Sequence, residues 1–266
     1  ESPEIVFSDG GLQMAVKVTD NTGKVVGQYI SLELAMKDAP AGSTIMLMDN
    51  VEITSTIETT KEYTLDLNGK TITSDGQRAL WIKSGTVIIN STLAGGKIDV
   101  PTCTNNDLSA IRVGSNESAD ATLIVAEGVT ISADECYGIT IFGTNSETLT
   151  VNGTVNTKSR PAISGNGSAG LASTTITIGQ NAQITTTNEV AIYHPQNGTL
   201  NIHGGTITGT TALEVRAGIV TIDGGTLTAT GNPYSCNPNG NGTTTVGAAL
   251  AIAQHTTKKD ITVSIS

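Results

Sequence analysis

The sequence has few aromatic residues, few charged residues and no long apolar run. Aromatic side chains make up 3% of the 266 residues and charged side chains 14%, against 37% for all hydrophobic types. No stretch of about 18 apolar residues occurs, so no segment is expected to span a bilayer. The mean hydropathy of +0.01 argues against a disordered chain, because the apolar residues are spaced for burial.

Basic residues are also scarce. The chain has 14 Lys and Arg against 24 Asp and Glu, which gives a formal net charge of −10. Nucleic acids and anionic membrane surfaces are bound by clusters of basic residues, so neither is expected as a partner. The chain begins ESPEIV, without Met or an apolar leader, which is the pattern of a processed or trimmed product.

Cysteine is limited to three residues, Cys103, Cys136 and Cys236, with no metal-ligand spacing. Cys103 lies in a predicted insertion and Cys136 lies one repeat later. A bridge between these two and three independent thiols are both compatible with the sequence, because an odd count alone does not decide pairing.

Thr, Gly and Asn are abundant, and one short phrase recurs. It reads TLDLNGKTIT from Thr64, TLNIHGGTIT from Thr199 and IVTIDGGTLTAT from Ile219. Looser copies begin at Thr86, Thr122, Thr148 and Thr175. Each copy alternates apolar and polar residues around a Gly or Asn turn, and such self-similarity predicts a solenoid.

Residues 1–56 differ from the rest and are predicted to cap the solenoid. Two short strands are expected around the turn at residues 21–23, followed by a helix from Ser31 that ends at Pro40. Its apolar face is expected to hold Leu32, Leu34, Ala35 and Ala39. The coils are predicted over residues 57–266, and cap and coils together form one structural domain.

Aligned copies predict aliphatic columns inside the solenoid. The first inward residues of successive coils are Leu65, Val87, Leu123, Leu149, Ile176, Leu200, Val220 and Ile261. In the coil around Leu200, a corner is expected at Gly204-Gly205 and a third segment near Leu213. We therefore predict an all-β fold, a single-stranded right-handed parallel β-helix with a short N-terminal capping helix.

With the capping segment SLELAMKDAPAGSTIMLMDN and phrases such as GTLNIHGGTIT, the chain resembles the pectin-lyase-like β-helix superfamily. The resemblance covers nearly the whole chain, and its phrasing is similar to that of secreted or cell-surface repeat proteins of bacteria. It implies either a pectate-lyase-like or polygalacturonase-like enzyme or a non-catalytic adhesin. Arg160-Pro161 is similar to part of an Arg-x-Pro element of the lyases, but no acidic ladder accompanies it.

The other catalytic and metal candidates are few. His203 and Asp223 are equivalent positions on consecutive coils, which suits an acid/base pair or a corner hydrogen bond. His194 falls in an inward column, and a local register shift before Pro195 is expected to remove it from the core. No metal site is predicted. Calcium is the one candidate ion, through Asp134-Glu135 or through Asn116-Glu117 with Asp120, and a solvated acidic face explains both groups equally.

A column of outward residues on the third segment is the candidate ligand-binding face. It is predicted to run Trp81, Arg112, Thr140, Ser164, Tyr193, Glu214 and Ala251. Aromatic faces pack on sugar C–H surfaces and charged side chains bind hydroxyls, so Trp81, Arg112, Tyr193 and Glu214 are predicted to bind carbohydrate. Ordinary surface residues, with Trp81 buried under the cap, are the alternative.

The sequence thus predicts a non-catalytic, secreted or cell-surface adhesin or carbohydrate-binding protein. Its expected partner is a polysaccharide or a host or cell-surface glycan, and the oligomeric state is left open. The alternative is a polysaccharide lyase or glycoside hydrolase acting on acidic polysaccharide. A purely structural spacer is the third hypothesis.

Overall fold

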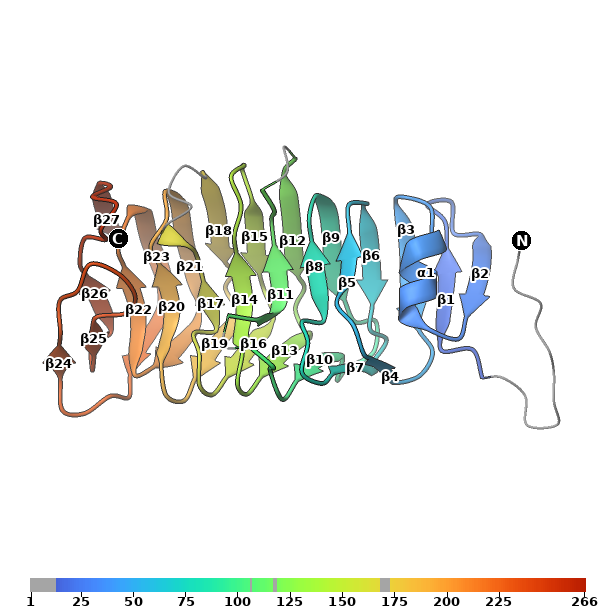
Figure 1. Cartoon of the computed structure of the whole chain (residues 1–266), viewed down its shortest axis with the longest axis horizontal. Coiled ribbons are helices and arrows are strands. Elements are labelled where there is room, and N and C mark those ends of the chain that lie inside the picture. The colour runs from blue at the N-terminus through green and yellow to red at the C-terminus, as the bar shows by residue number, and fades with distance from the viewer. Residues whose placement is uncertain (1–12, 106, 117–118, 168–172) are drawn as a thin grey trace.

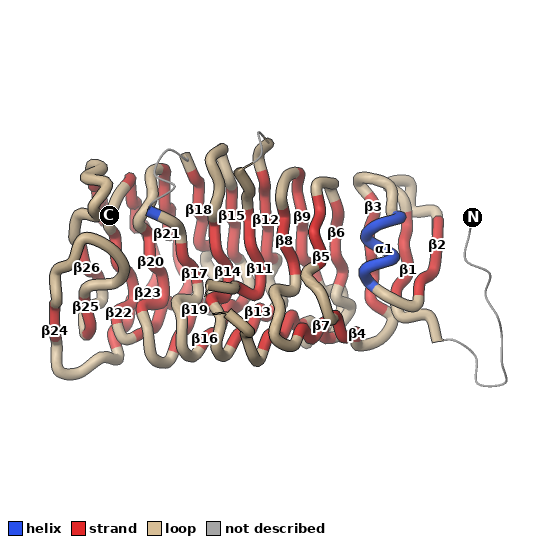
Figure 2. Tube along the Cα trace, viewed as in Figure 1, coloured by secondary structure: helices blue, strands red, loops and turns tan. Residues whose placement is uncertain are grey.

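The computed structural model describes residues 13–105, 107–116, 119–167 and 173–266. Over these residues the protein consists mainly of β-strands, most of them in two long sheets of parallel strands. Figure 1 shows that successive strands follow the long axis of the molecule in chain order. The single α-helix lies near the N-terminal end (Figure 2).

The larger sheet, sheet A, contains two rows of parallel strands. The first row is β3 (Ser43–Leu47), β6 (Tyr63–Asp66), β9 (Gly85–Asn90), β12 (Ala121–Val125), β15 (Thr148–Val151), β18 (Thr174–Ile178), the first halves of β21 (Gly198–Gly209) and β23 (Gly218–Ala229), and β27 (Ile261–Ile265). The second row is β4 (Val51–Ile53), β7 (Thr71–Ser74), β10 (Lys97–Val100), β13 (Thr130–Ala133), β16 (Thr154–Thr157), β19 (Gln183–Thr186) and the second halves of β21 and β23.

Sheet B supplies a third row, also parallel. It contains β5 (Ile57–Thr59), β8 (Leu80–Ile82), β11 (Ser109–Val113), β14 (Tyr137–Ile141), β17 (Ile163–Ser164), β20 (Val190–His194), β22 (Thr211–Val215) and β26 (Leu250–Ile252). One strand from each row, taken in chain order, makes what we call a tier. A short antiparallel pair, β24 (Ser235–Cys236) and β25 (Thr245–Val246), lies in the loop between β23 and β26.

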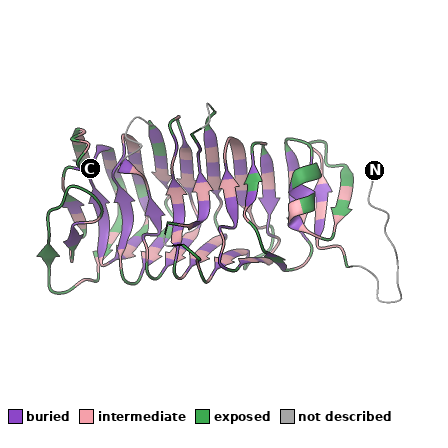
Figure 3. Cartoon of the chain, viewed as in Figure 1, coloured by how far each residue is buried: buried purple, intermediate pink, exposed green. Residues whose placement is uncertain are grey.

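The predicted inward column is confirmed in its centre and wrong by two residues at each end. Val87, Leu123, Leu149, Ile176, Leu200 and Val220 pair in one register and are fully buried. Leu65 instead pairs with Ile89, and Val220 pairs with Val263 rather than Ile261. A register shift of two residues keeps a side chain on the same face of a strand, so the predicted inward and outward faces remain correct although the predicted partners do not. Figure 3 shows this alternation along the strands.

The N-terminal cap has the predicted elements, with a different boundary and helix face. β1 (Val16–Thr19) pairs antiparallel with β2 (Val25–Tyr29) and β3, which covers the edge of the first row. Helix α1 (Leu32–Asp38) begins after Ser31, whose Oγ accepts a hydrogen bond from the Leu34 amide at 3.2 Å. Leu34 itself is exposed, and Met36 is buried in its place.

Parallel pairing begins at β3 and β4, two strands before the predicted boundary at residue 57, where β5 starts. Contacts from the next tier also close the end of α1. The Tyr63 hydroxyl donates to the Met36 carbonyl at 2.7 Å, and Lys61 Nζ donates to the Lys37 carbonyl at 2.9 Å. These bonds satisfy carbonyls that a helix C-terminus leaves without partners, and they join the cap to the tier that begins with β6. The predicted corner at Gly204-Gly205 is confirmed, since Gly205 has a φ of +78°.

Candidate functional site

A groove with a volume of about 560 Å³ lies on the outer face of sheet B. Residues before and along the strands β8 to β20 form its floor and sides, and the loop before β26 forms its far wall. The lining side chains that carry charge or an aromatic ring are Arg78, Asp107, Arg112, Tyr137, Phe142, Arg160, Glu189 and Tyr193, and Asn241, Gly242 and Thr243 contribute the loop wall.

The predicted outward column has the predicted register, and its middle residues, Arg112, Thr140, Ser164 and Tyr193, line the groove. Trp81 pairs with Arg112, Arg112 with Thr140, Thr140 with Ser164, Ser164 with Tyr193, Tyr193 with Glu214 and Glu214 with Ala251. Arg112 and Tyr193 are three strand spacings apart, which corresponds to about 14 Å. The register of the column is therefore confirmed, whereas its role in binding stays a prediction.

Trp81 is half-buried beside the groove and does not line it. Its Nε1 donates a hydrogen bond to the Gly114 carbonyl at 2.8 Å. The Arg112 guanidinium and Lys83 Nζ lie 4.6 and 4.7 Å from the ring centroid. The ring therefore holds cations in place by cation–π contact, and the capping helix does not bury it.

Arg112 lies in the groove, at the position in the outward column that the sequence predicts. Its guanidinium lies between two aromatic rings, 4.6 Å from the centroid of Trp81 and 4.2 Å from that of Phe142. Burial lowers the pKa of Arg112. Its Nε is buried and has no hydrogen-bond partner in the protein. The group is thus held at the groove with donor capacity left over.

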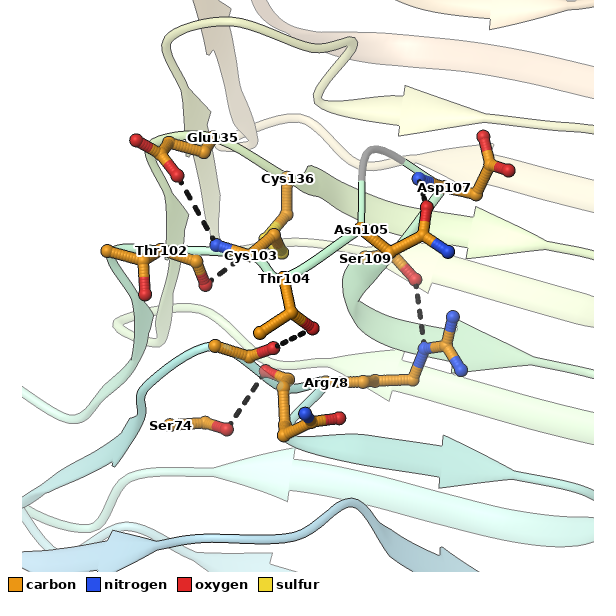
Figure 4. The surroundings of a disulfide bond; sticks show 12 residues. Ser74, Arg78, Thr102, Cys103, Thr104, Asn105, Asp107, Ser109, Glu135 and Cys136 are labelled. Carbon is orange, nitrogen blue, oxygen red and sulfur yellow. Dashed lines mark hydrogen bonds between the residues drawn. A yellow bond between two sulfur atoms is a disulfide. The ribbon is translucent and has the colours of Figure 1, made fainter.

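Arg78 adds a second guanidinium at the same end of the groove. It precedes β8, is 8% exposed, and its Nε lies 3.4 Å from the Ser109 hydroxyl (Figure 4). Burial and, next, the positive charge of Arg112 lower the pKa of Arg78 to about 10. Arg78 therefore remains cationic at neutral pH despite the repulsion from Arg112.

The middle of the groove carries charges of both signs around Tyr137. Asp107, Arg160 and Glu189 line the groove there, and the Arg160 guanidinium lies 5.6 Å from the centroid of the Tyr137 ring. Burial is the main cause that raises the pKa of Tyr137, and the charges of Asp107 and Glu189 raise it further while Arg160 opposes them. At neutral pH the phenol is therefore a hydrogen-bond donor, not a phenolate.

Glu214 does not belong to an exposed ligand-binding face, contrary to the prediction. It is fully buried under the loop before β26, where its carboxylate accepts bonds from the Thr244 amide at 2.8 Å and the Thr244 hydroxyl at 2.7 Å. Tyr193 is 8% exposed, but it still lines the far end of the groove. Burial raises the pKa of Tyr193. The alternation along the strands does not predict this cover, because the loop lies outside the strands of the solenoid.

Arg216, two residues after Glu214, holds the same loop. It is fully buried, and its guanidinium donates to the carbonyl oxygens of Ala253 (2.9 Å), Asn239 (2.8 Å), Gln254 (3.0 Å) and Gly242. Its Nε also lies 4.0 Å from Glu214 Oε1. The loop that forms the groove's far wall is therefore fixed by one buried ion pair.

His203 and Asp223 are in contact, as predicted, on sheet A and away from the groove, but they are not equivalent positions, because a register shift pairs His203 with Gly224. His203 Nδ1 lies 2.9 Å from Asp223 Oδ1, and both side chains are more than 40% exposed. No further carboxylate or nucleophile contacts the pair among the described residues. The geometry is that of an exposed hydrogen bond between neighbouring strands.

His194 lies in the core, and the expected register shift before Pro195 is wrong. It pairs with Val215 in the inward column and is fully buried. Its Nδ1 lies 3.2 Å from Gln196 Nε2, and burial lowers the pKa of His194 to about 4. The ring is thus neutral at physiological pH, and no acidic side chain contacts it in the described part of the chain.

The buried His194 predicts a pH-dependent stability. Its pKa is about 4 in the folded protein against about 6.5 in an unfolded chain, so the unfolded state binds more protons between these values. Stability is expected to fall as pH drops from 6.5, by about 3 kcal/mol at pH 4 from this residue. Urea unfolding at both pH values should show a smaller loss for His194→Asn than for wild type. Equal losses in the two proteins would contradict the assignment.

Cys103 and Cys136 form a disulfide between neighbouring tiers (Figure 4), with Cα atoms 5.8 Å apart. Cys236 is free and exposed. Of the two alternatives compatible with the sequence, a bridge between Cys103 and Cys136 or three independent thiols, the structure therefore has the bridge. Tyr137 follows Cys136 directly and Asp107 lies four residues after Cys103, so the cross-link joins two segments that line the groove.

The calcium candidates are engaged elsewhere or lie outside the described residues. Asp134 pairs with Lys158, Glu135 accepts a 3.5 Å bond from the Cys103 amide, and Asp120 accepts a 3.1 Å bond from the Ser146 amide. Glu117 lies outside the described residues. In the described part of the chain, no three His, Cys, Asp or Glu side chains gather into a group that would hold a metal ion.

The groove residues that the sequence interpretation left out of its binding face are Arg78, Asp107, Tyr137, Phe142, Arg160 and Glu189. The positions of the arginines in the sequence could have indicated some of these residues. The chain has four arginines, and all of them lie within, or within three residues of, strands of sheet B. Arg78 and Arg160 precede their strands, so the column of outward strand residues does not include them.

Comparisons of this chain with protein families, with curated proteins and with solved structures find no match. Within the described residues, no helix is both long and apolar enough to cross a membrane.

Proposed function

We propose that this protein is a non-catalytic, exported β-helix that binds carbohydrate in the groove over sheet B. The observation that carries the proposal is the groove itself. It combines arginines with aromatic side chains on a preformed face of parallel strands. Aromatic rings pack against sugar C–H surfaces, and guanidinium groups bind oxygen substituents through several donors.

The proposed architecture is a single-stranded right-handed parallel β-helix of the pectin-lyase-like type. Three parallel rows joined tier by tier support it, as does the N-terminal helix that closes one end. The right hand follows from the general preference of parallel crossover connections. In this architecture a glycan chain lies across the strands of sheet B, so successive sugars meet successive tiers.

Export to the cell surface or the extracellular space is supported by the disulfide. Disulfides persist in oxidising compartments and are rare in reducing ones. The net charge of −10 and the covered N-terminal edge are compatible with a soluble surface protein. The proposed partner is a polysaccharide or a host or cell-surface glycan.

Blocking the groove tests this function. Thr140 lies half-buried on β14 and lines the groove, and Thr150 lies half-buried on β15 of the next tier, on the outer face of sheet A. Thr140→Trp is expected to weaken binding of the glycans selected on an array at least about tenfold, because the indole occupies the space of the ligand. Thr150→Trp is expected to bind as wild type. Isothermal titration measures both affinities, and equal binding by both variants would place the ligand elsewhere.

A polysaccharide lyase or glycoside hydrolase is the second candidate, and one observation favours it. Asp107 and Glu189 line the same groove, on either side of Arg160 in the chain, and hydrolysis of glycosidic bonds uses two carboxylates. Release of reducing or unsaturated ends from a bound polysaccharide would favour this candidate. Intact polysaccharide after prolonged incubation, with binding retained, supports the non-catalytic function.

A further inference from the structure

Two arginines at one end of the groove carry positive charge without a protein counter-charge in contact. Neither Arg78 nor Arg112 forms an ion pair with a described carboxylate. Glu58, the acidic group whose charge acts on Arg78, forms its own ion pair with Lys83 at 3.0 Å. Half-buried charges are usually paired, because removing them from water is unfavourable.

Arg216 shows what a structural arginine looks like in this protein. Its guanidinium donates to four backbone carbonyls, and it lies beside the carboxylate of Glu214. Arg112 makes no such bonds: its guanidinium is in contact with two ring faces, and its Nε has no hydrogen-bond partner. The rings fix the orientation of the group and leave its donors free, which is the condition for binding a ligand with little loss of side-chain entropy.

From this contrast we infer that Arg78 and Arg112 form an oxyanion subsite, which binds a carboxylate or sulfate substituent of the glycan. The inference rests on the proposed function of the groove and adds the chemical class of its ligand. A planar guanidinium fork matches the oxygens of either substituent. The chain as a whole is acidic, with a formal net charge of −10, so the positive charge at this end of the groove is opposite in sign to the net charge of the protein.

The lowered pKa of Arg78 agrees with this geometry. Burial and the charge of Arg112 both disfavour its protonated form, and an anion bound between the two guanidinium groups would relieve the repulsion. The two arginines are on neighbouring tiers, one before β8 and one on β11, which brings them within reach of one substituent.

Three probes of similar length test the subsite: a uronate oligosaccharide, a sulfated oligosaccharide and a neutral oligosaccharide. We expect at least one anionic probe to bind more tightly than the neutral one, with an affinity that falls as NaCl rises from about 0.05 M to about 0.5 M. Which anionic probe binds identifies the substituent. Arg112→Gln and Arg78→Gln are each expected to weaken its binding at least about tenfold. Lys24→Gln, at an exposed position in the turn between β1 and β2, is the matched control.

The outcomes separate this inference from the proposed function. If only the neutral probe binds and Thr140→Trp blocks it, the groove binds carbohydrate and the oxyanion subsite is overturned. If an anionic probe binds equally to wild type, Arg112→Gln and Thr140→Trp, both proposals fail. Arg112→Lys keeps the charge and loses the planar fork, so partial binding in this variant supports the inference even where Arg112→Gln folds poorly.

Discussion

Replacing Arg216 with Met is expected to lower the free energy of unfolding by about 3–5 kcal/mol, which is the cost of removing one partner of a buried ion pair. Arg216 and Glu214 are both fully buried, and the substitution leaves the Glu214 carboxylate without its cation and four carbonyls without their donor. A side chain of similar length fills the space, so the loss is one of polar contacts rather than of packing. Urea unfolding of wild type and variant measures the difference.

The loss is expected to be concentrated at the C-terminal end, because each tier of a stacked structure contacts only its neighbours. Hydrogen–deuterium exchange should increase over residues 237–256 in Arg216→Met and remain unchanged over the tiers around Leu123. Lys24→Met removes the same charge at an exposed site and is expected to cost less than about 0.5 kcal/mol. An unchanged exchange pattern in Arg216→Met would show that other contacts hold the loop.

Glycan binding should fall in the same variant. Asn241, Gly242 and Thr243 form the far wall of the groove, and Arg216 bonds directly to the Gly242 carbonyl. A released loop opens the groove at the end where Tyr193 lies. Retained affinity in a variant with rapid loop exchange would confine the ligand to the end at Arg112.

Removing the disulfide is expected to have an effect of similar size. The bridge closes a loop with a sequence separation of 33, and the chain-entropy relation gives a loss of about 4 kcal/mol for the double variant Cys103→Ala, Cys136→Ala. Cys136 is fully buried, so part of any loss in this variant comes from the smaller side chain. Urea unfolding of wild type with and without reductant isolates the cross-link, because reduction keeps both side chains.

Cys236→Ala is the matched control, since its thiol is exposed and unbridged. It is expected to unfold at the denaturant concentration of wild type. Identical unfolding of oxidised and reduced wild type would contradict a stabilising role for the bridge. A loss of glycan binding on reduction would show that the cross-link also orders the segments that carry Asp107 and Tyr137.

Local sequence pattern predicted much of the fold, because the alternation of apolar and polar residues belongs to the strand itself. The capping helix after Ser31 and the inward column from Val87 to Val220 follow from short-range signals. The errors in register at Leu65 and Ile261 are both of two residues, because a periodicity of two identifies the face of a strand but not its partner.

The candidate site depended on contacts that no local pattern contains. The outward column from Trp81 to Ala251 was predictable because equivalent residues of parallel strands lie side by side. The buried state of Glu214 was not predictable, because it depends on a loop that is distant in the sequence. The inward column did indicate burial of His194, and the expected register shift before Pro195 was the error.

By itself, then, the sequence determined the β-strand class, the parallel pairing and the face on which Arg112 lies, since all three follow from repetition along the chain. Only the tertiary structure decided that Cys103 pairs with Cys136, that Arg216 holds a loop over the sheet, and that Arg78 joins Arg112 in a groove. Those features bring together residues from different tiers and from irregular loops, where neither periodicity nor propensity carries information.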